Sequence, residues 1–248
     1  MNLQLLILMS GRDDSFREAG YLYPKTLVEI AGMPLVQVVL NSLAELRAQS
    51  ARVIVTIRRE EDRKHHTGAV IHLIEPRADV VLIDDTAGAA CSALLAIEHI
   101  DPNAPLVIMN GDQLLRADLP QILEGFAKQD LDGGIIVFEA VHPRWSYVRC
   151  DADGYVVETA EKRPISNLAT AGIYYFKRAG DFLSATMSMI KKNAHVGNNY
   201  FVCPAYNELV LNQGRVGIAK VPKTAYVSLH TPEGVHAYQA EAERRGAA

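Results

Sequence analysis

Two charged residues in the first half of this chain are suited to chemistry on a phosphorylated substrate. Lys25 follows Pro24, so its ammonium is a point charge for phosphate on a segment that proline stiffens. Asp112 follows an apolar run, and a carboxylate at a strand end suits Mg²⁺, which binds one or two carboxylates together with substrate phosphates. The alternative role for Asp112 is to cap the next helix. The adjacent Gly111, which would let the backbone approach a ligand, favours the metal.

A loop that begins at Met9 is the first candidate for binding a nucleotide. It carries Ser10, Gly11 and Arg12 directly after an apolar run. A glycine at a strand end lets backbone N–H groups turn toward an anion, which indicates phosphate binding. An ordinary surface loop with solvated charges is the alternative, because a single glycine is weak evidence.

Two further segments could complete a nucleotide site. Small residues that include Gly88 and Ala89 begin a predicted helix, where a flat base or sugar could approach closely. Tight helix packing accounts for these small residues equally well. Asn110 and Gly111 precede Asp112 at the end of an apolar run, so they are expected beside it.

The second half of the chain carries the candidates for an acceptor site. Glu161 could accept hydrogen bonds from sugar hydroxyls and Lys162 could meet a phosphate, although adjacent opposite charges usually form a solvated pair. Asn199 and Tyr200 could line an acceptor pocket or form an ordinary junction between loop and helix. The pair at 65–66, His65-His66, lies among other charges and is interpreted as a solvated loop.

The elements that must position these residues follow from hydrophobic patterning. Short apolar runs, rich in β-branched residues, predict strands at Leu3–Met9, Ala51–Ile57, Val80–Ile83, Pro105–Met109, Gly133–Phe138, Thr170–Phe176 and Val216–Lys220. Helical spacing predicts helices at Pro34–Arg47, Ala87–Ile100, Leu119–Lys128, Phe182–Asn193 and Pro204–Gln213. Strands alternating with helices indicate parallel strands joined by right-handed crossovers, and this alternation loosens after Asp112. Ligands of such sheets bind outside the carboxyl ends of the strands, so the candidate loops should share one rim.

Composition limits the class of protein. The chain has 248 residues, 49% of them hydrophobic, which is enough for one large α/β domain or two small ones. The formal net charge of −4 argues against nucleic-acid binding through bulk charge. The scattered cysteines favour a reduced, cytoplasmic location. The first apolar run is too short to span a bilayer, so no membrane insertion is expected. Val227 and Leu229 could belong to the core or to an oligomer interface.

Taken in order, the candidate segments carry a recognisable set of motifs. A proline-lysine motif is formed by Pro24, Lys25, Leu27, Val28, Ile30, Gly32, Pro34 and Leu35. It is followed by Asn110-Gly111-Asp112, then by Glu161-Lys162 with Pro164 and the stretch Ala171–Tyr174, and finally by Thr231-Pro232-Glu233. In this order the motifs resemble the sugar-phosphate nucleotidyltransferase family, across most of the chain. Gln113 gives the N-x-D-Q form that is similar to the group found in capsule and surface-polysaccharide pathways.

The resemblance implies a fold and a reaction. The fold is a Rossmann-like α/β/α sandwich with a mostly parallel mixed central sheet, of the nucleotide-diphospho-sugar transferase type. Residues 1–240 would form a single domain, with a nucleotide-binding half at 1–115, an acceptor-binding half at 116–240 and a tail at 241–248. The implied reaction joins an NTP and a sugar 1-phosphate, giving an NDP-sugar and pyrophosphate, with Mg²⁺ as cofactor.

The resemblance also assigns roles to residues. By analogy Asp112 holds Mg²⁺, and Lys25 steadies the phosphates as the second catalytic residue. The nucleotide-binding set is Met9, Ser10, Gly11, Arg12, Gly88, Ala89, Asn110 and Gly111. The acceptor-binding set is Glu161, Lys162, Gly172, Asn199 and Tyr200.

Two departures from the family pattern leave alternatives open. Asp13, Asp14 and Ser15 stand where the family carries Gly, Ser or Thr, and Arg. Carboxylates beside a triphosphate would repel it by roughly 1 kcal/mol per close pair. Ser228 stands where many members carry a second metal-binding Asp, and His230 replaces a glycine. The alternatives are a type-A glycosyltransferase that uses a nucleotide sugar, and a binding module that has lost catalysis.

Overall fold

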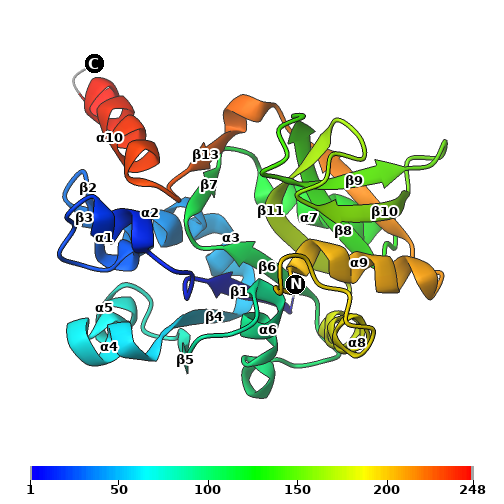
Figure 1. The fold of residues 1–248 in the computed structure, drawn as a ribbon, viewed down its shortest axis with the longest axis horizontal. Helices are drawn as coiled ribbons and strands as arrows, with labels where there is room; N and C mark the ends of the chain where they lie inside the picture. The colour runs from blue at the N-terminus through cyan, green and yellow to red at the C-terminus, as the bar shows by residue number, and fades with distance from the viewer. Residues whose placement is uncertain (1, 247–248) are drawn as a thin grey trace.

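The computed structural model describes residues 2–246, which form an α/β/α sandwich around a nine-stranded sheet (Figure 1). The strand order is β10-β9-β11-β6-β1-β4-β5, and β8 joins β11 to β12. The strands of this sheet are β1 Leu3–Leu8, β4 Ser50–Arg58, β5 Asp79–Ile83, β6 Leu106–Asn110, β8 Gly133–Glu139, β9 Ser146–Cys150, β10 Val156–Glu161, β11 Leu168–Phe176 and β12 Val216–Lys220. The predicted α/β fold with a mixed central sheet is therefore confirmed.

Helices cover both faces of the sheet because its strands are apolar on both sides. Along β1, Leu5 and Ile7 belong to one hydrophobic core and Leu6 to a second. The helices are α1 Asp14–Glu18, α2 Leu35–Ser42, α3 Ala44–Gln49, α4 Arg59–His65, α5 Thr67–Ile74, α6 Ala89–Leu94, α7 Leu119–Lys128, α8 Ala179–Lys191, α9 Val202–Leu211 and α10 Pro232–Gly246. Side chains of α2 and α7 pack into the first core, and those of α6, α8 and α9 into the second.

The sheet changes direction at β11. Strands β5, β4, β1 and β6 run parallel, whereas β11 is antiparallel to β6, β8 and β9. Short strand pairs lie outside the main sheet: β2 Glu29–Ile30 with β3 Met33–Pro34, and β7 Gln113–Leu115 with β13 Tyr226–Ser228. One-turn helices lie at η1 Lys25–Leu27, η2 Ile97–His99 and η3 Lys223–Ala225. The parallel strands thus place their carboxyl ends on one rim, next to the antiparallel half.

The predicted strands are confirmed, each within two residues at either end, but several helices differ from prediction. The predicted helix Pro34–Arg47 is broken at Leu43 into α2 and α3. The predicted helix Ala87–Ile100 shortens to α6 followed by η2. The solvated loop expected at His65-His66 is wrong, because α4 ends at His65. Its acidic first turn and basic last turn complement the helix dipole.

The C-terminal part of the chain settles another open point. Leu229 is fully buried in the first core and so belongs to the interior, whereas Val227 is partly buried and packs against that core. The segment expected as a tail continues α10 to Gly246, while Ala247 and Ala248 lie outside the described residues. None of the helices between residues 2 and 246 is long and apolar enough to cross a membrane.

Candidate functional site

A cavity of about 1060 Å³ opens along the rim where the parallel strands end. Its walls come from the loops after β1, β5 and β6, from the β9–β10 hairpin, and from the segments before α9 and α10. The predicted site residues that line it are Met9, Ser10, Gly11, Arg12, Lys25, Gly88, Ala89, Asn110, Gly111, Asp112, Glu161, Lys162, Gly172 and Asn199. The structure therefore brings together residues that are far apart in sequence. Tyr200 is the predicted residue that does not line the cavity.

Lys25 and Asp112 form a close ion pair on the wall of the cavity. Lys25 Nζ lies 2.6 Å from Asp112 Oδ2, and the lysine side chain is only 7% exposed. Pro24, with an extended backbone, leads into the one-turn helix η1 and so fixes where Lys25 begins. Asp112 directly follows the turn after β6, which pairs with β1 in the centre of the sheet. The predicted phosphate-binding cation and the predicted metal-binding carboxylate are thus in direct contact.

His230, in the segment between β13 and α10, contacts the same carboxylate oxygen. Its Nδ1 lies 2.7 Å from Asp112 Oδ2. Burial raises the pKa of Asp112, but the Lys25 ammonium and the His230 imidazole together lower it further, so the net pKa lies well below the ordinary value. Asp112 is therefore an anion across the physiological pH range.

The loop after β1 is held close to this ion pair. Met9 N–H donates to Thr56 O at 2.9 Å, and the hydroxyls of Ser10 and Thr56 lie 3.3 Å apart. A Cβ on Gly11 would lie 3.9 Å from Lys25 Nζ, so the loop passes beside the ammonium. The backbone of Ser10 and Gly11 is thus placed next to a cation, as an anion-binding loop requires.

Gly111 is explained by packing. A Cβ there would lie 2.2 Å from Met9 Cγ, so the side chain of Met9 already fills that space. The close approach of a ligand to the Gly111 backbone stays a prediction, and Gly111 does line the cavity. Its neighbour Asn110 has Nδ2 3.5 Å from Gln113 Oε1, so the Asn110 side chain is directed toward the Gln113 side-chain amide.

The acidic residues of the first loop do not face the cavity. Asp13 and Asp14 are absent from its lining, and both pair with Arg17, at 3.5 and 2.5 Å. Arg12 lies in the lining and contacts Asp85 at 3.7 Å. The two carboxylates are therefore neutralised within α1 and its N-terminus, away from the lining of the cavity.

Gly88 joins the two halves of the chain. Its φ is +104°, and a Cβ there would lie 2.5 Å from Tyr200 O. Tyr200 N–H donates to Ala87 O at 2.7 Å, and Ala90 N–H donates to Tyr200 O at 3.0 Å. The glycine therefore permits a close backbone junction between the start of α6 and the segment before α9. The sequence allowed either tight packing or the close approach of a base or sugar at Gly88, and the structure shows tight packing.

The same junction explains why Tyr200 stays out of the cavity. Its backbone is used in the junction and its hydroxyl donates to Asn193 Oδ1 at 3.0 Å, so the geometry gives no support to its predicted acceptor contact. Asn199 remains in the lining, with Nδ2 bonded to Gly197 O at 2.9 Å.

The antiparallel half supplies a buried acid, Glu161, and a cation, Lys162, to the lining of the cavity. Glu161 is 9% exposed and accepts a hydrogen bond from Ser146, so the solvated charge pair anticipated with Lys162 is wrong for Glu161. Burial raises the pKa of Glu161, and the Ser146 hydroxyl opposes that change. Lys162 adopts a left-handed backbone (φ +53°), and its Nζ lies 5.3 Å from the centre of the Phe201 ring.

Gly172 lies where β11 loses its regular pairing with β8, between Thr170 and Tyr174. A Cβ at Gly172 would lie 2.6 Å from Asn110 Nδ2. Gln113 Nε2 donates to Ala171 O next to it. This irregularity brings the end of β6 and the middle of β11 together beneath the cavity.

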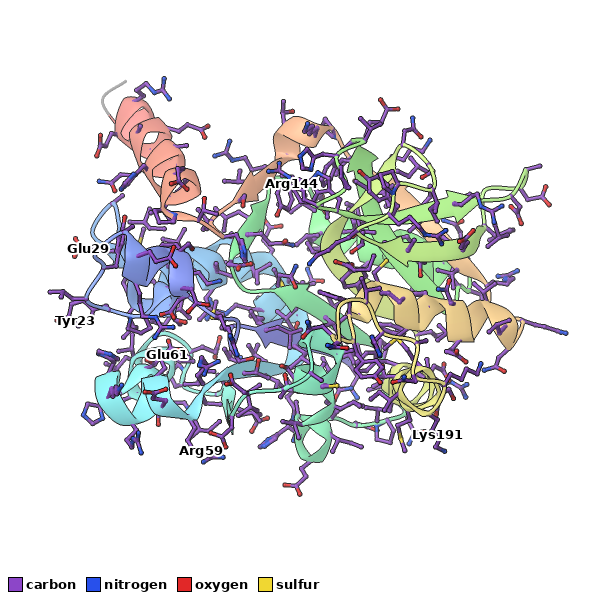
Figure 2. The ribbon with its side chains drawn as sticks, in the orientation of Figure 1. Tyr23, Glu29, Arg59, Glu61, Arg144 and Lys191 are labelled. Carbon is purple, nitrogen blue, oxygen red and sulfur yellow. The ribbon has the colours of Figure 1, made fainter. Side chains whose placement is uncertain are left out.

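Several lining residues were missed by the sequence analysis, most clearly Arg144 and Trp145. The Arg144 guanidinium lies 4.5 Å from the centre of the Trp145 ring, and the structure records no acid partner for it between residues 2 and 246. Trp145 packs edge-on against Phe138 and Tyr226. Figure 2 shows Arg144 near β13, as the Trp145–Tyr226 contact requires. The sequence signal that could have identified them is the chain's single tryptophan, Trp145, directly after an arginine.

The donor set at Asp112 fits a metal only if a substrate supplies further ligands. Within residues 2–246 no group of three or more His, Cys, Asp or Glu side chains converges on one point. Mg²⁺ in nucleotide enzymes keeps waters and binds one or two carboxylates plus substrate phosphates. Asp112 can provide such a carboxylate, so the predicted cofactor is compatible with a site shared between protein and nucleotide.

Comparison with known proteins gives consistent results. A family model described as nucleotidyl transferase matches residues 5–206. UTP–glucose-1-phosphate uridylyltransferase AglF of Haloferax volcanii is 26% identical over 186 residues, which cover 71% of this chain and 73% of that protein. Bifunctional protein GlmU of Methanocaldococcus jannaschii is 24% identical over 179 residues, covering 71% of this chain but 40% of its own length.

A solved structure shows the same fold. The nucleoside-diphosphate-sugar pyrophosphorylase from Vibrio cholerae RC9 aligns with a TM-score of 0.83 at 24% identity, covering 95% of this chain and 99% of that one. The agreement extends through both the parallel and the antiparallel parts of the sheet, because almost the whole of each chain is aligned.

Proposed function

The chain belongs to the nucleotidyl transferase family and is a nucleotidyltransferase, and on this premise we propose that it joins an NTP to a sugar 1-phosphate or a similar small phosphate. The products are an NDP-sugar and pyrophosphate. The observation that carries the proposal is the cavity itself, whose lining includes both the Lys25–Asp112 pair and Glu161 with Lys162. An anionic donor and an anionic acceptor each meet a cation in this arrangement.

The proposed reaction is a single displacement. An oxygen of the acceptor phosphate forms a bond to the α-phosphorus of the NTP, and the bond from that phosphorus to the bridging oxygen breaks. The electron pair leaves with pyrophosphate. Such transfers depend mainly on positioning and charge neutralisation, because the protein need form no covalent bond.

On the donor side, we assign Lys25 to the phosphates and the backbone of Ser10 and Gly11 to the same anion. Asp112 would hold Mg²⁺, which when bound neutralises phosphate charge. The base is proposed to lie near Gly88 and Ala89. These assignments rest on cavity lining and on the short distances around Lys25.

On the acceptor side, Glu161 is proposed to accept hydrogen bonds from sugar hydroxyls and Lys162 to meet the acceptor phosphate. Glu161 is buried and held by Ser146, which suits a fixed acceptor of hydrogen bonds. The proposed nucleotide half at 1–115 and acceptor half at 116–240 correspond to these two sides. A role for the product in surface-polysaccharide synthesis is supported by the N-x-D-Q motif alone, and cytoplasmic NTPs would supply the donor.

The alternatives now have less support. The binding-module hypothesis depended on Asp13 and Asp14 repelling a triphosphate, and both pair with Arg17 outside the cavity lining. A glycosyltransferase would release a nucleoside diphosphate in place of pyrophosphate, so the released product separates the two reactions.

The proposal is tested by pyrophosphate release with Mg²⁺ across the four common NTPs and a panel of sugar phosphates. We expect release to require one NTP and one acceptor. Asp112→Asn should reduce kcat/KM at least about 100-fold, because charge neutralisation at the phosphates is lost. Asp153→Asn, in the exposed turn of the β9–β10 hairpin, is the control and should match the parent. Full activity in Asp112→Asn, with the folded state checked by circular dichroism, would refute the role of Asp112.

A further inference from the structure

The segment between β13 and α10 is fixed beside Asp112 by backbone hydrogen bonds. Strand β13 pairs with β7, which sets Ser228 opposite Gln113. Leu229 N–H then donates to Asp112 O at 2.9 Å. The next residue, His230, consequently projects its imidazole at the Asp112 carboxylate, with Nδ1 2.7 Å from Oδ2. The contact is therefore determined by the sheet pairing that precedes it.

Between residues 2 and 246, the cavity lining two positions before His230 carries a serine and not a second carboxylate. Ser228, two residues before His230, lines the cavity. Its hydroxyl accepts a hydrogen bond from the His230 backbone N–H at 3.4 Å. The other partner of the carboxylate is the Lys25 ammonium, on the same oxygen as His230. A cation is thus already accommodated at Oδ2, and of these two partners the imidazole is the one that can ligate a metal.

We propose that His230 is a second metal ligand, so that the site proposed above for nucleotidyl transfer binds Mn²⁺ in preference to Mg²⁺. The inference rests on the proposed metal role of Asp112. Mg²⁺ strongly prefers oxygen ligands, whereas imidazole suits the first-row transition metals and raises their affinity relative to Mg²⁺. A pair of one carboxylate and one imidazole therefore discriminates between these ions in a way that two carboxylates would not.

The imidazole can switch from a hydrogen-bond donor to a metal ligand by a change of tautomer. As a donor to the carboxylate, Nδ1 carries the proton; as a ligand it is the unprotonated nitrogen of the other neutral tautomer, with the proton on Nε2. The side chain of His230 is 67% exposed, so solvent can bond to Nε2. Lys25 would then be released from Asp112 toward the phosphates, which is the role proposed for it.

The direct test is pulsed electron paramagnetic resonance on the whole protein with bound Mn²⁺. Protein labelled with ¹⁵N-histidine distinguishes an imidazole nitrogen from a purine nitrogen when an NTP is added. We expect a ¹⁵N coupling typical of a coordinated histidine in the parent protein and its loss in His230→Asp. Absence of the coupling in the folded parent protein overturns the proposal without any variant.

A second measurement addresses the choice of metal. Free Mn²⁺ is titrated by its resonance signal in competition with Mg²⁺, and the ratio of the two dissociation constants is compared between variants. His230→Asp should shift that ratio toward Mg²⁺ by about tenfold, since it replaces nitrogen by oxygen. An unchanged ratio would contradict the proposal.

A matched control uses another exposed histidine. His236 on α10 bonds to Tyr21 and lies outside the cavity lining, so His236→Ala should leave both the coupling and the ratio unchanged. Neither readout requires turnover. A histidine coupling together with absent pyrophosphate release would support the metal site while counting against the proposed reaction.

Discussion

At the scale of single residues, the site is organised by how its charges are paired. Two cations of the cavity lining contact carboxylates, Lys25 that of Asp112 and Arg12 that of Asp85. Two others, Lys162 and Arg144, instead lie over aromatic rings. A cation on an aromatic face keeps its charge available to a ligand, at a modest cost in desolvation. The cavity wall at Lys162 and Arg144 is therefore more open to a new anion.

This asymmetry makes Arg144 a test of acceptor binding. Arg144→Gln should raise the KM for the sugar phosphate about tenfold, since one charge-assisted contact is lost, and should leave the KM for the NTP unchanged. Steady-state kinetics with each substrate varied in turn measure both constants. Arg149→Gln, which alters an exposed strand arginine paired with Glu158, is the control. An equal change in both KM values would show that Arg144 acts on the site as a whole.

At the scale of elements, strands were predicted well because their signal is local. Short apolar runs end at glycine or polar residues, as at Ser10-Gly11 after β1. Each such strand can therefore be recognised from its own segment of the sequence. Helices α4 and α5 were missed because a charged stretch with two histidines resembles a loop. The charge order from Glu60 to His65, acidic and then basic, was the overlooked sign of a helix.

Site residues within one continuous motif could be predicted from the sequence. Residues that reach the site only through strand pairing between distant segments could not. The segment around Lys25 is positioned by its own proline and η1, so its sequence sufficed. Arg144 and Trp145 reach the cavity only because Ser146 pairs with Glu161 across the β9–β10 hairpin. His230 reaches Asp112 through the pairing of β13 with β7. Such registers are set by the folded sheet and leave little trace in one sequence.

Helix α4 also contains a buried acid whose ionisation opposes folding. Glu61 is 8% exposed and lies on the inner side of α4 in Figure 2. Its pKa is raised to about 7, mainly by burial. The Asp13 charge also raises the pKa, whereas the hydrogen bonds from Thr26 and Thr67 and the Lys25 charge lower it. The folded pKa exceeds the ordinary value of 4.5, so stability from this group is present below pH 4.5 and is lost as pH rises through 7.

Glu61→Gln should remove this pH dependence. The penalty at high pH is at most roughly 3 kcal/mol, from a shift of about 2.5 units at 1.36 kcal/mol each. Urea unfolding at pH 5 and pH 8 should therefore show the variant gaining more stability relative to the parent at pH 8 than at pH 5. Glu60→Gln, at an exposed position on the same helix, is the control. An equal difference between parent and variant at both pH values would contradict the assignment.

At the scale of the whole molecule, several contacts join residues 1–115 to residues 116–240 around the cavity. One is the pairing of β6 with β11 in the sheet, and another is the backbone junction of Gly88 with Tyr200. Because Gly88 has a positive φ and no space for a Cβ, the junction depends on a residue without a side chain. The distance between the proposed donor and acceptor residues should therefore respond to substitutions at Gly88.

Gly88→Ala is predicted to lower the free energy of unfolding by roughly 2 kcal/mol, from strain at positive φ and the clash with Tyr200 O. It should also speed hydrogen exchange at the Tyr200 and Ala90 amides, whose bonds form the junction. Gly125→Ala, within α7 and with open space around it, should instead be neutral or stabilising. Unchanged exchange at both amides would show that the junction tolerates a side chain.

The pairing of β13 with β7 has a consequence for the order of folding. The nine-stranded sheet uses residues up to Lys220, and its strands position Lys25 and Asp112. The wall formed by Ser228, His230 and Thr231 follows it in the chain. A folding chain can therefore hold the sheet before it holds a closed site, and nucleotide capture would be delayed until that wall folds against the Asp112 segment.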